Sequence, residues 1–584
     1  MKIKEYIDNL KIIFNIISVR RKIQIYYFPL LVLVGAIAEI ASIGAIFPFL
    51  TVLVDPEKIT NNEIIRSTIN IFGFDLEGDV PRKITLAFSV IVVVSSILRM
   101  ALVYFTAKLN YGIGHEIGVA VFRVTLYRGY EYHVERNSSE TIGALHKVDE
   151  VVWAIFMLLN MISAIVMACG ILLTLLFINI VFSIFSVSTL IAIYALVFLF
   201  VRRTLAKDGE IVSQSINSRV QIIQEGLGCI RDILLDQSQA VVIKKFARVD
   251  FSMRNAQARL NIIAPSPRFA VEGAGMVLVA ILAYSLAVGG EGLALGVPAL
   301  GALALGAQRL MPLIQQIYHG WVVVSSKRNV LIDIVNILKG PVVCEALEKI
   351  SPLNFERDIY LDGITFQYKE ILPIIIDNIS LRIKKGDRVG IVGPSGCGKT
   401  TLIDIVMGLL QPTAGRILVD GVILDTLNRF EWQRNIAHVP QDIYIVDGTM
   451  AENIALGVPP KDIDPERLRQ VANLAQLSLV IERHPDGYDA SVGERGIRLS
   501  GGQRQRLGIA RALYRGANIL IFDEATSALD EAAEEAVVQG LRSIDRQLTL
   551  FIVTHRNATL RDCNYVIELD NGRIKRVTKR GEAS

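Results

Sequence analysis

The chain has 584 residues, of which 52% are hydrophobic and 20% charged, and its mean hydropathy is +0.44. An average soluble domain is about 25% charged, so this composition argues against a disordered or collagen-like chain. The 61 basic and 57 acidic residues leave a net charge of +4, which provides no pervasive basic field for binding nucleic acid. The five cysteines have neither metal-binding nor disulfide-framework spacing, which is typical of a reducing compartment or a lipid environment.

Six long apolar runs lie before residue 325 and predict membrane-spanning helices. A helix needs about 20 apolar residues to cross roughly 30 Å of hydrocarbon, and each run is long enough. The first run is too long for a signal-peptide core, and no small-residue cleavage site follows it. Buried helices of a soluble protein give the same signal singly, but six such runs favour spans. The runs cover roughly residues 23–54, 84–107, 151–178, 180–201, 269–288 and 293–324.

The distribution of Lys and Arg predicts the orientation of these spans. Residues 1–22 contain six basic residues and residues 202–267 contain ten, whereas Asn179 and residues 289–292 provide none. Because basic segments stay on the cytoplasmic side, we expect a multi-pass protein of the inner (cytoplasmic) membrane. With six spans, both termini and the whole C-terminal half then lie in the cytoplasm.

Two polar stretches are too long to be turns between spans. Segments Gly118–Tyr127 and Val212–Leu227 within them have helical spacing, so we expect the membrane helices to extend into the cytoplasm. On the outer side, Glu63–Phe72 has apolar residues on one face. An amphipathic helix on the membrane surface and a partly ordered loop both fit this segment.

A glycine-rich segment, residues 393–400, carries the strongest chemical signal. It follows the apolar segment Arg388–Val392 and precedes the apolar segment 401–406, which predicts the strand, loop and helix that a phosphate-binding loop requires. Glycines let several backbone N–H groups point at one anion, and the helix adds its positive end. Lys399 then reaches the β and γ phosphates, and the Thr400 hydroxyl ligates Mg²⁺. The expected nucleotide-binding residues here are Gly393, Pro394, Ser395, Gly396, Cys397, Gly398, Lys399, Thr400 and Thr401.

Two carboxylates, Asp523 and Glu524, follow the apolar strand Ile519–Phe522. We expect Asp523 to hold Mg²⁺ and Glu524 to act as general base on the attacking water. A strand that merely ends in acidic residues gives the same pattern. The phosphate-binding loop upstream favours the catalytic interpretation.

A second predicted anion site opens the helix Arg504–Leu513. Its residues are Ser500, Gly501, Gly502 and Gln503, a serine and glycines at a helix start. One nucleotide does not need two helix N-termini from the same domain on opposite sides of its γ-phosphate. We therefore expect two copies of the domain, each contributing this segment to the other's ATP.

These motifs together resemble the ATP-binding-cassette (ABC) proteins, whose signature pentapeptide matches Leu499–Gln503. The resemblance implies that Tyr368 stacks on adenine and that Gln441 contacts Mg²⁺ and the attacking water. It also implies that His555, after the strand Leu550–Thr554, contacts the γ-phosphate. Alone, such a tyrosine or histidine is usually structural; six matches in order are specific. The other matching segments are Gly493–Gly496 and Ser527–Asp530, the latter with Asp530 at the nucleotide.

Carried over residue by residue, this resemblance implies ATP and Mg²⁺ as cofactors. Cys397 occupies a variable position of the loop and is expected to pack rather than react. The implied catalytic residues are Glu524, His555, Gln441 and Lys399, and the implied metal-binding residues are Thr400, Gln441 and Asp523.

Six spans before one cassette resemble an exporter-type half-transporter over essentially the whole chain. The implied fold is an α-helical membrane domain of six transmembrane helices (type I exporter, or type IV ABC fold) joined to an α/β P-loop NTPase cassette. The implied coupling helices lie near Glu116–Tyr127 and Ile211–Gln221. One loop and one signature per chain require a dimer, and a homodimer suffices. The expected domains are residues 1–325 (membrane), 326–356 (linker), 357–576 (cassette) and 577–584 (tail).

Ionisable residues within the spans usually face a cavity or a partner, because each costs at least about 2.5 kcal/mol in a membrane. These residues are Glu39, Arg99, Arg268, Glu272 and Arg309. Internal ion pairing explains them as well as a water-filled cavity does. In a cavity, the arginines would bind an anionic head group such as phosphate or pyrophosphate, which their planar fork suits.

Short segments around Arg268, Glu272 and Arg309 look similar to the subgroup that flips lipid-linked oligosaccharides or exports polysaccharide and glycolipid. No peptidase domain precedes residue 23, which disfavours exporters that cleave a leader peptide. We therefore expect an ATP-driven exporter or flippase of an amphipathic, lipid-linked substrate. The alternatives are a multidrug, lipid or peptide exporter, an ATP-gated channel or regulator, and a soluble ABC ATPase of DNA repair or translation.

Overall fold

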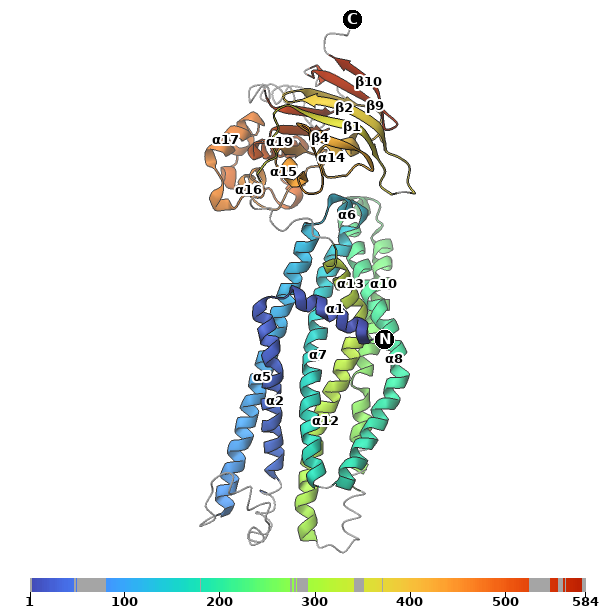
Figure 1. The fold of residues 1–584 in the computed structure, drawn as a ribbon, viewed down its shortest axis with the longest axis vertical. Helices are drawn as coiled ribbons and strands as arrows, with labels where there is room; N and C mark the ends of the chain where they lie inside the picture. Colours follow the sequence, from blue (N-terminus) through green and yellow to red (C-terminus); the bar gives the residue numbers. More distant parts are fainter. Residues whose placement is uncertain are drawn as a thin grey trace. The chain divides into compact units, whose positions relative to one another are not determined.

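The computed structural model divides into two compact units. The helical unit comprises Met1–Arg128 and Glu135–Val342, and the sheet unit comprises Gly129–Val134 and Val343–Ser584 (Figure 1). The structure describes residues 3–46, 49, 80–178, 180–273, 276–277, 280, 293–340, 351–369, 371–524, 547–554, 560–561 and 563–579.

Long helices make up the described part of the helical unit. α5, α7 and α8 contain 47, 41 and 49 residues. At 1.5 Å per residue these helices are roughly 60 to 75 Å long, about twice the hydrocarbon thickness, which is the length that the expected extensions beyond the membrane require. The helices are α1 (Ile3–Ile16), α2 (Val19–Gly44), α5 (Val80–Leu126), α7 (Ser138–Ile178), α8 (Ile180–Gly228), α9 (Ile230–Leu235), α10 (Gln239–Ile263), α12 (Leu293–Ser326) and α13 (Arg328–Leu338).

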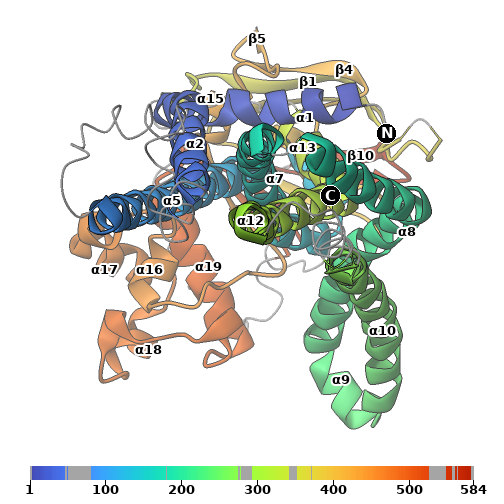
Figure 2. The ribbon, with the colours of Figure 1, turned by 90° about the horizontal axis from the view of Figure 1, so that it is seen from below.

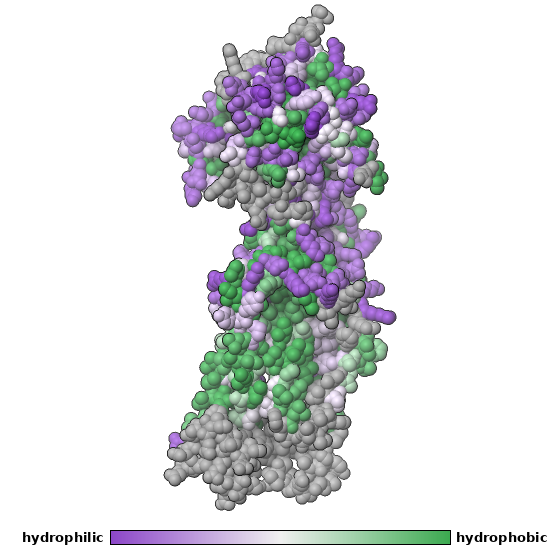
Figure 3. All heavy atoms as spheres, viewed as in Figure 1, coloured by the Kyte–Doolittle hydropathy of each residue, from purple (hydrophilic) through white to green (hydrophobic). Residues whose placement is uncertain are grey.

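Three of the described helices are long and apolar enough to cross a membrane, over Val19–Ser42, Ile84–Leu126 and Ser139–Thr174. They contain the first three predicted runs, except for the end of the first run. The other three predicted runs each contain residues or side chains that the structure does not describe. Glu63–Phe72 lies entirely outside the described residues. Apolar side chains gather over the middle of the visible face of the helical unit, whereas hydrophilic side chains are frequent at its end nearer the sheet unit and over the sheet unit itself (Figure 3). An apolar exterior of this extent suits lipid rather than water.

Two short helices lie beyond the segments expected to carry the coupling helices. Glu116–Tyr127 and Ile211–Gln221 belong almost wholly to the continuous helices α5 and α8. The helix α5 ends shortly before α6 (Tyr130–Glu135), and α8 ends shortly before α9. The short helix α9 joins α8 to the adjacent α10 (Figure 2). Contacts group Gly129–Val134 with the sheet unit.

The segment expected to begin the linker contains α13, which packs within the helical unit. Its buried residues Val330 and Ile334 share one face, as their spacing of four requires, and they join a core formed with α1, α5 and α7. The Lys147 ammonium on α7 lies 2.6 Å from an Asp333 carboxylate oxygen on α13, and the Ser213 hydroxyl on α8 donates to the same oxygen at 3.0 Å. Packing and this buried cation fix the position of α13.

The sheet unit contains two sheets. One is antiparallel, in the order β2-β1-β4-β5; the other has the order β10-β9-β3-β8-β7-β6, in which only the β10–β9 pair is antiparallel. The strands are β1 (Asp358–Phe366), β2 (Ile376–Lys384), β3 (Arg388–Val392), β4 (Ala414–Val419), β5 (Val422–Ile423), β6 (Ile436–Val439), β7 (Ile519–Asp523), β8 (Thr549–Val553), β9 (Tyr565–Asp570) and β10 (Arg573–Lys579). The helices are α6, α14 (Lys399–Val406), α15 (Arg429–Gln433), α16 (Met450–Ile454), α17 (Pro465–Leu474), α18 (Ser478–Glu482) and α19 (Gly501–Arg515).

The parallel sheet is buried on both faces, and strand alternation assigns its residues to two cores. On β7, Ile519 and Ile521 belong to the core that contains α14. Their neighbours Leu520 and Phe522 belong to the core that contains α19. A strand buried on both faces has a continuous run of apolar residues, and this run is the pattern from which the sequence predicts β7.

Trp432 on α15 is completely buried, and its indole N–H donates to the Val406 carbonyl at 2.8 Å. Trp432→Ala should lower the stability of the sheet unit by about 3–5 kcal/mol, because it leaves a cavity and an unpaired buried carbonyl. Thermal unfolding of the purified chain should show a lower midpoint. Leu427→Ala is the matched control; this side chain is 85% exposed, so its loss should change stability by less than about 0.5 kcal/mol. Equal midpoints for the two variants would contradict this packing.

Candidate functional site

The glycine-rich loop connects β3 to α14, as predicted. Gly393 and Gly398 have φ values of +154° and +102°, and a side chain at either would approach a backbone oxygen, that of Leu569 at 2.3 Å or of Ile375 at 3.0 Å. Only glycine fits both positions. The loop therefore passes close to the backbone of two neighbouring segments. It also presents the first N–H groups of α14, which have no partner within the helix, as an anion-binding end.

Lys399 begins α14 and points back over this loop. Its ammonium donates to the carbonyl oxygens of Gly393 at 2.9 Å and Pro394 at 3.1 Å, and the residue is 8% exposed. A lysine ammonium has three N–H groups, so one remains to donate to a phosphate oxygen. The loop thus holds a positive charge at the place where phosphates are expected.

Thr400 and Asp523 lie together although 123 positions separate them. The Thr400 hydroxyl donates to an Asp523 carboxylate oxygen at 3.4 Å, because parallel strands bring the ends of β3 and β7 to one edge of the sheet. Burial and the adjacent Glu524 charge raise the pKa of Asp523, while the Thr400 hydrogen bond and Lys399 act in the opposite direction. A hydroxyl and a carboxylate oxygen are hard donors that fit Mg²⁺ shared with phosphates.

Asp404 is a carboxylate that the sequence analysis missed. Burial and the charge of Asp523 raise its pKa to about 6. It stands four residues after Thr400 on α14, and that spacing puts both side chains on one helix face. This spacing was the available signal. The group adds a further acidic side chain beside the expected metal site.

Glu524 contacts Gln441, the glutamine expected to contact the same attacking water. The Gln441 side-chain amide, just beyond β6, donates to a Glu524 carboxylate oxygen at 2.9 Å. Glu524 also has a φ of +50°, which is unusual for a residue with a side chain, and its backbone N–H donates to Val553 on β8 at 3.0 Å. The carboxylate is therefore fixed at the sheet edge that carries Asp523, as a general base requires.

Tyr368 lies beside the start of α14. Its hydroxyl is 3.5 Å from the Thr401 hydroxyl, and its ring meets the Phe366 ring edge-on, with 5.0 Å between centroids. Cys397 is buried, as a packing residue would be. His555 and Asp530 lie outside the described residues, so their roles stay predictions.

Ser500 caps α19. Its hydroxyl accepts from the Gln503 backbone N–H at 3.3 Å, and the Gln503 side chain accepts from the Ser500 N–H at 2.9 Å. This reciprocal cap fixes the helix start but leaves the N–H groups of Gly501 and Gly502 without intrahelical partners. The predicted second anion site thus has the geometry of an open helix end.

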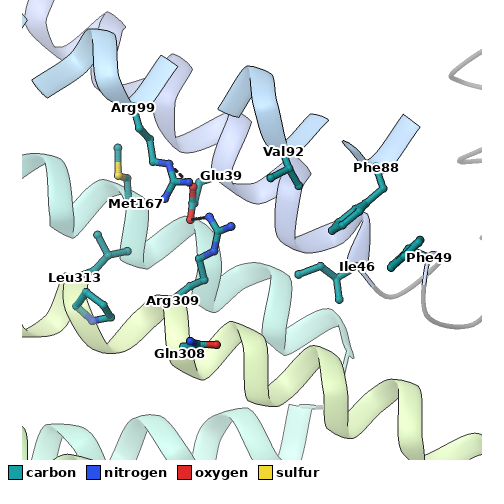
Figure 4. A pocket seen from close by; sticks show the side chains of 11 residues that line it. Glu39, Ile46, Phe49, Phe88, Val92, Arg99, Met167, Gln308, Arg309 and Leu313 are labelled. Atoms are coloured by element: carbon teal, nitrogen blue, oxygen red, sulfur yellow. Dashed lines mark hydrogen bonds and ion pairs between the residues drawn. The ribbon is translucent and has the colours of Figure 1, made fainter. Parts of the chain in front are cut away.

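Three of the five ionisable residues predicted in the spans meet in the helical unit. The Glu39 carboxylate on α2 lies 2.6 Å from Arg309 on α12 and 3.3 Å from Arg99 on α5 (Figure 4). They line a cavity of about 600 Å³. Arg268 and Glu272 do not join this cluster; they pair with each other at 2.5 Å, four residues apart. The internal pairing that the sequence left open is therefore present at both places.

Comparison with known proteins identifies the cassette. Residues 376–527 match the family described as ABC transporter. This segment of the chain is therefore an ABC transporter cassette. The fold of the chain matches a solved bacterial Atm1-family ABC exporter with ATP bound, at a TM-score of 0.76 and 21% identity over 96% of this chain and 95% of that one. The helical membrane fold with a P-loop cassette, expected from the resemblance, is thus confirmed.

Curated relatives carry several different transport names. An ATP-dependent lipid A-core flippase of Ralstonia nicotianae is 41% identical over 37% of this chain and 37% of that protein. A mycobactin import ATP-binding/permease protein of Mycolicibacterium thermoresistibile is 35% identical over 51% of this chain and 52% of that protein. An alpha-hemolysin translocation ATP-binding protein of Escherichia coli O157:H7 is 29% identical over 84% and 69%. The matched segments of the first two relatives span less than two thirds of their length.

Glu524→Gln should leave ATP binding intact but lower ATP turnover by roughly 10²–10⁴-fold, because it removes the general base and keeps the shape of the side chain. Lys399→Ala provides the contrast: it should weaken ATP binding itself by roughly tenfold or more through the lost charge-assisted bond. Nucleotide-binding titration and phosphate release, measured on both variants, separate the two effects. Turnover at the wild-type rate in Glu524→Gln would remove this carboxylate from catalysis.

Proposed function

We propose that this chain is one half of a homodimeric, ATP-driven exporter or flippase of the inner membrane, with both termini and the cassette in the cytoplasm. One observation carries the proposal: a single chain joins helices with an apolar exterior to a loop at which Lys399, Thr400, Asp523 and Glu524 stand together. Such a chain combines a domain that can hydrolyse ATP with a membrane domain whose conformation the hydrolysis can change.

Two chains are needed because each contributes one phosphate-binding loop and one Ser500–Gln503 helix end. ATP binding closes the two cassettes head to tail, with each γ-phosphate between a loop and the partner's helix end. Thr400, Asp523 and Gln441 would hold Mg²⁺, which would supply positive charge to the β and γ phosphates. Glu524 takes the proton of the attacking water, and His555 contacts the γ-phosphate. Hydrolysis then separates the cassettes and resets the membrane helices.

The proposed cargo is an amphipathic molecule with an anionic head group, such as a lipid-linked oligosaccharide, glycolipid or polysaccharide precursor. Two arginines, Arg99 and Arg309, border one cavity in the helical unit, and the planar guanidinium suits phosphate. The flippase name of one relative supports a lipid-linked cargo, whereas the other names do not distinguish it from siderophore or protein cargo.

Reconstitution into liposomes tests this function. ATP should drive a polyprenyl-diphosphate-linked saccharide from the cassette-side leaflet to the other leaflet, and this lipid should stimulate ATPase activity. Stimulation by hydrophobic cations or peptides instead would indicate a multidrug or peptide exporter. Ion conductance without stoichiometric movement of any lipid would indicate a channel.

Arg309→Gln combined with Arg99→Gln should reduce movement of the diphosphate-linked lipid by roughly tenfold or more per ATP hydrolysed, because two charge-assisted contacts to the head group are lost. A lipid-linked saccharide with a neutral linkage should be affected much less. Arg254→Gln is the matched control, because Arg254 on α10 is largely exposed and distant in sequence from the cavity. Equal transport of the charged lipid by the double variant and the control would contradict an anionic cargo site.

A further inference from the structure

The buried carboxylate of Glu39 on α2 contacts both arginines of the cluster, Arg99 on α5 and Arg309 on α12. One carboxylate oxygen contacts an Arg309 guanidinium nitrogen at 2.6 Å. The other contacts the Arg99 guanidinium at 3.3 Å and accepts a hydrogen bond from the Ser95 hydroxyl at 3.4 Å. Figure 4 shows the two arginines reaching the same carboxylate from opposite helices. The single acid thus ties three helices together.

The charges of this cluster do not balance. Two guanidinium groups share one carboxylate, which leaves one positive charge in excess. The Glu39 side chain is 4% exposed, whereas those of Arg99 and Arg309 are 36% and 29% exposed. Among the described residues that line the cavity, these three are the ionisable ones; the others are apolar apart from Gln308. An excess charge in apolar surroundings is costly, so an anion entering the cavity gains strongly.

A phosphate-type anion and the Glu39 carboxylate need the same guanidinium N–H groups. A diphosphate carries at least two negative charges and has more acceptor oxygens than a carboxylate. Its oxygens can therefore accept from both guanidinium groups more fully than the two oxygens of one carboxylate can. The carboxylate lines the cavity, so it has somewhere to turn when an anion replaces it.

We propose that Glu39 is a built-in competitor for the cargo head group: its carboxylate holds Arg99 and Arg309 until a lipid-linked diphosphate displaces it. This inference rests on the anionic cargo of the proposed function. Displacement also removes the ion pairs that join α2 to α5 and α12, so head-group binding is coupled to the contacts between these helices. Weak and nonspecific anions, which bring too little charge to displace Glu39, are rejected by the same competition.

The experiment measures binding of farnesyl diphosphate to the detergent-purified full-length chain by calorimetry, with farnesol as the neutral probe. All proteins carry Lys399→Ala, so that the diphosphate does not use the nucleotide loop. Glu39→Gln keeps the shape and a polar contact but removes the competing charge, and it should bind farnesyl diphosphate roughly tenfold more tightly. Glu39→Asp keeps the charge and should remain much closer to the parent protein. Farnesol binding should not respond to either change.

A second variant, Ser95→Ala, tests the same proposal independently if Glu39→Gln does not fold. Ser95→Ala removes only the hydroxyl that holds Glu39, and it should strengthen diphosphate binding in the same direction by about twofold to threefold. Unchanged affinity in both Glu39→Gln and Ser95→Ala, together with weaker binding in Arg309→Gln, would overturn the competitor while keeping the anionic cargo site. Binding that no variant changes, Arg309→Gln included, would instead contradict the proposed cargo.

Discussion

Parallel pairing of β3, β8, β7 and β6 brings the carboxyl ends of four strands to one edge of a sheet, and the chemistry of the cassette depends on this edge. The phosphate loop leaves β3, Asp523 and Glu524 end β7, and Gln441 follows β6. Distant parts of the chain thereby meet within hydrogen-bond distance. Ligands bind at such edges in open α/β sheets for this reason. The φ of +50° at Glu524 places local backbone strain at the residue expected to act as base.

A second constraint operates in the helical unit, where charge is costly. Glu39, Arg99 and Arg309 remain tolerable because they pair, yet the pairing is incomplete by one charge. Ion pairing and cargo binding were alternatives in the sequence. In the structure they are compatible, because a paired arginine whose guanidinium still borders a cavity can exchange its partner. The separate pair of Arg268 and Glu272 joins one guanidinium group to one carboxylate.

Local patterns allowed the sequence to predict the cassette elements closely. The apolar run Arg388–Val392 is β3 with the same bounds, and Ser500 caps α19 as expected, because a short apolar run and a capping serine are signals encoded within a few residues. Features set by distant contacts were not predictable in this way. Within the segment expected to begin the linker, α13 packs against the helical unit, where Asp333 pairs with the buried Lys147. The short helix α6 follows α5 at Tyr130–Glu135. Asp404 escaped notice because its one signal, a spacing of four residues from Thr400, is shared by many helical carboxylates that have no role at a site.

Mixing two inactive variants tests the central claim, that each ATP is shared between two chains, most directly. One chain carries Lys399→Ala in its phosphate loop, and the other carries Ser500→Arg at its helix end. In a mixed dimer with shared sites, both defects fall on one nucleotide and the other site is intact, so ATPase activity should rise well above that of either variant alone. If each chain instead completes its own site, every site in the mixture is defective, and activity that stays at the level of the separate variants would contradict the account.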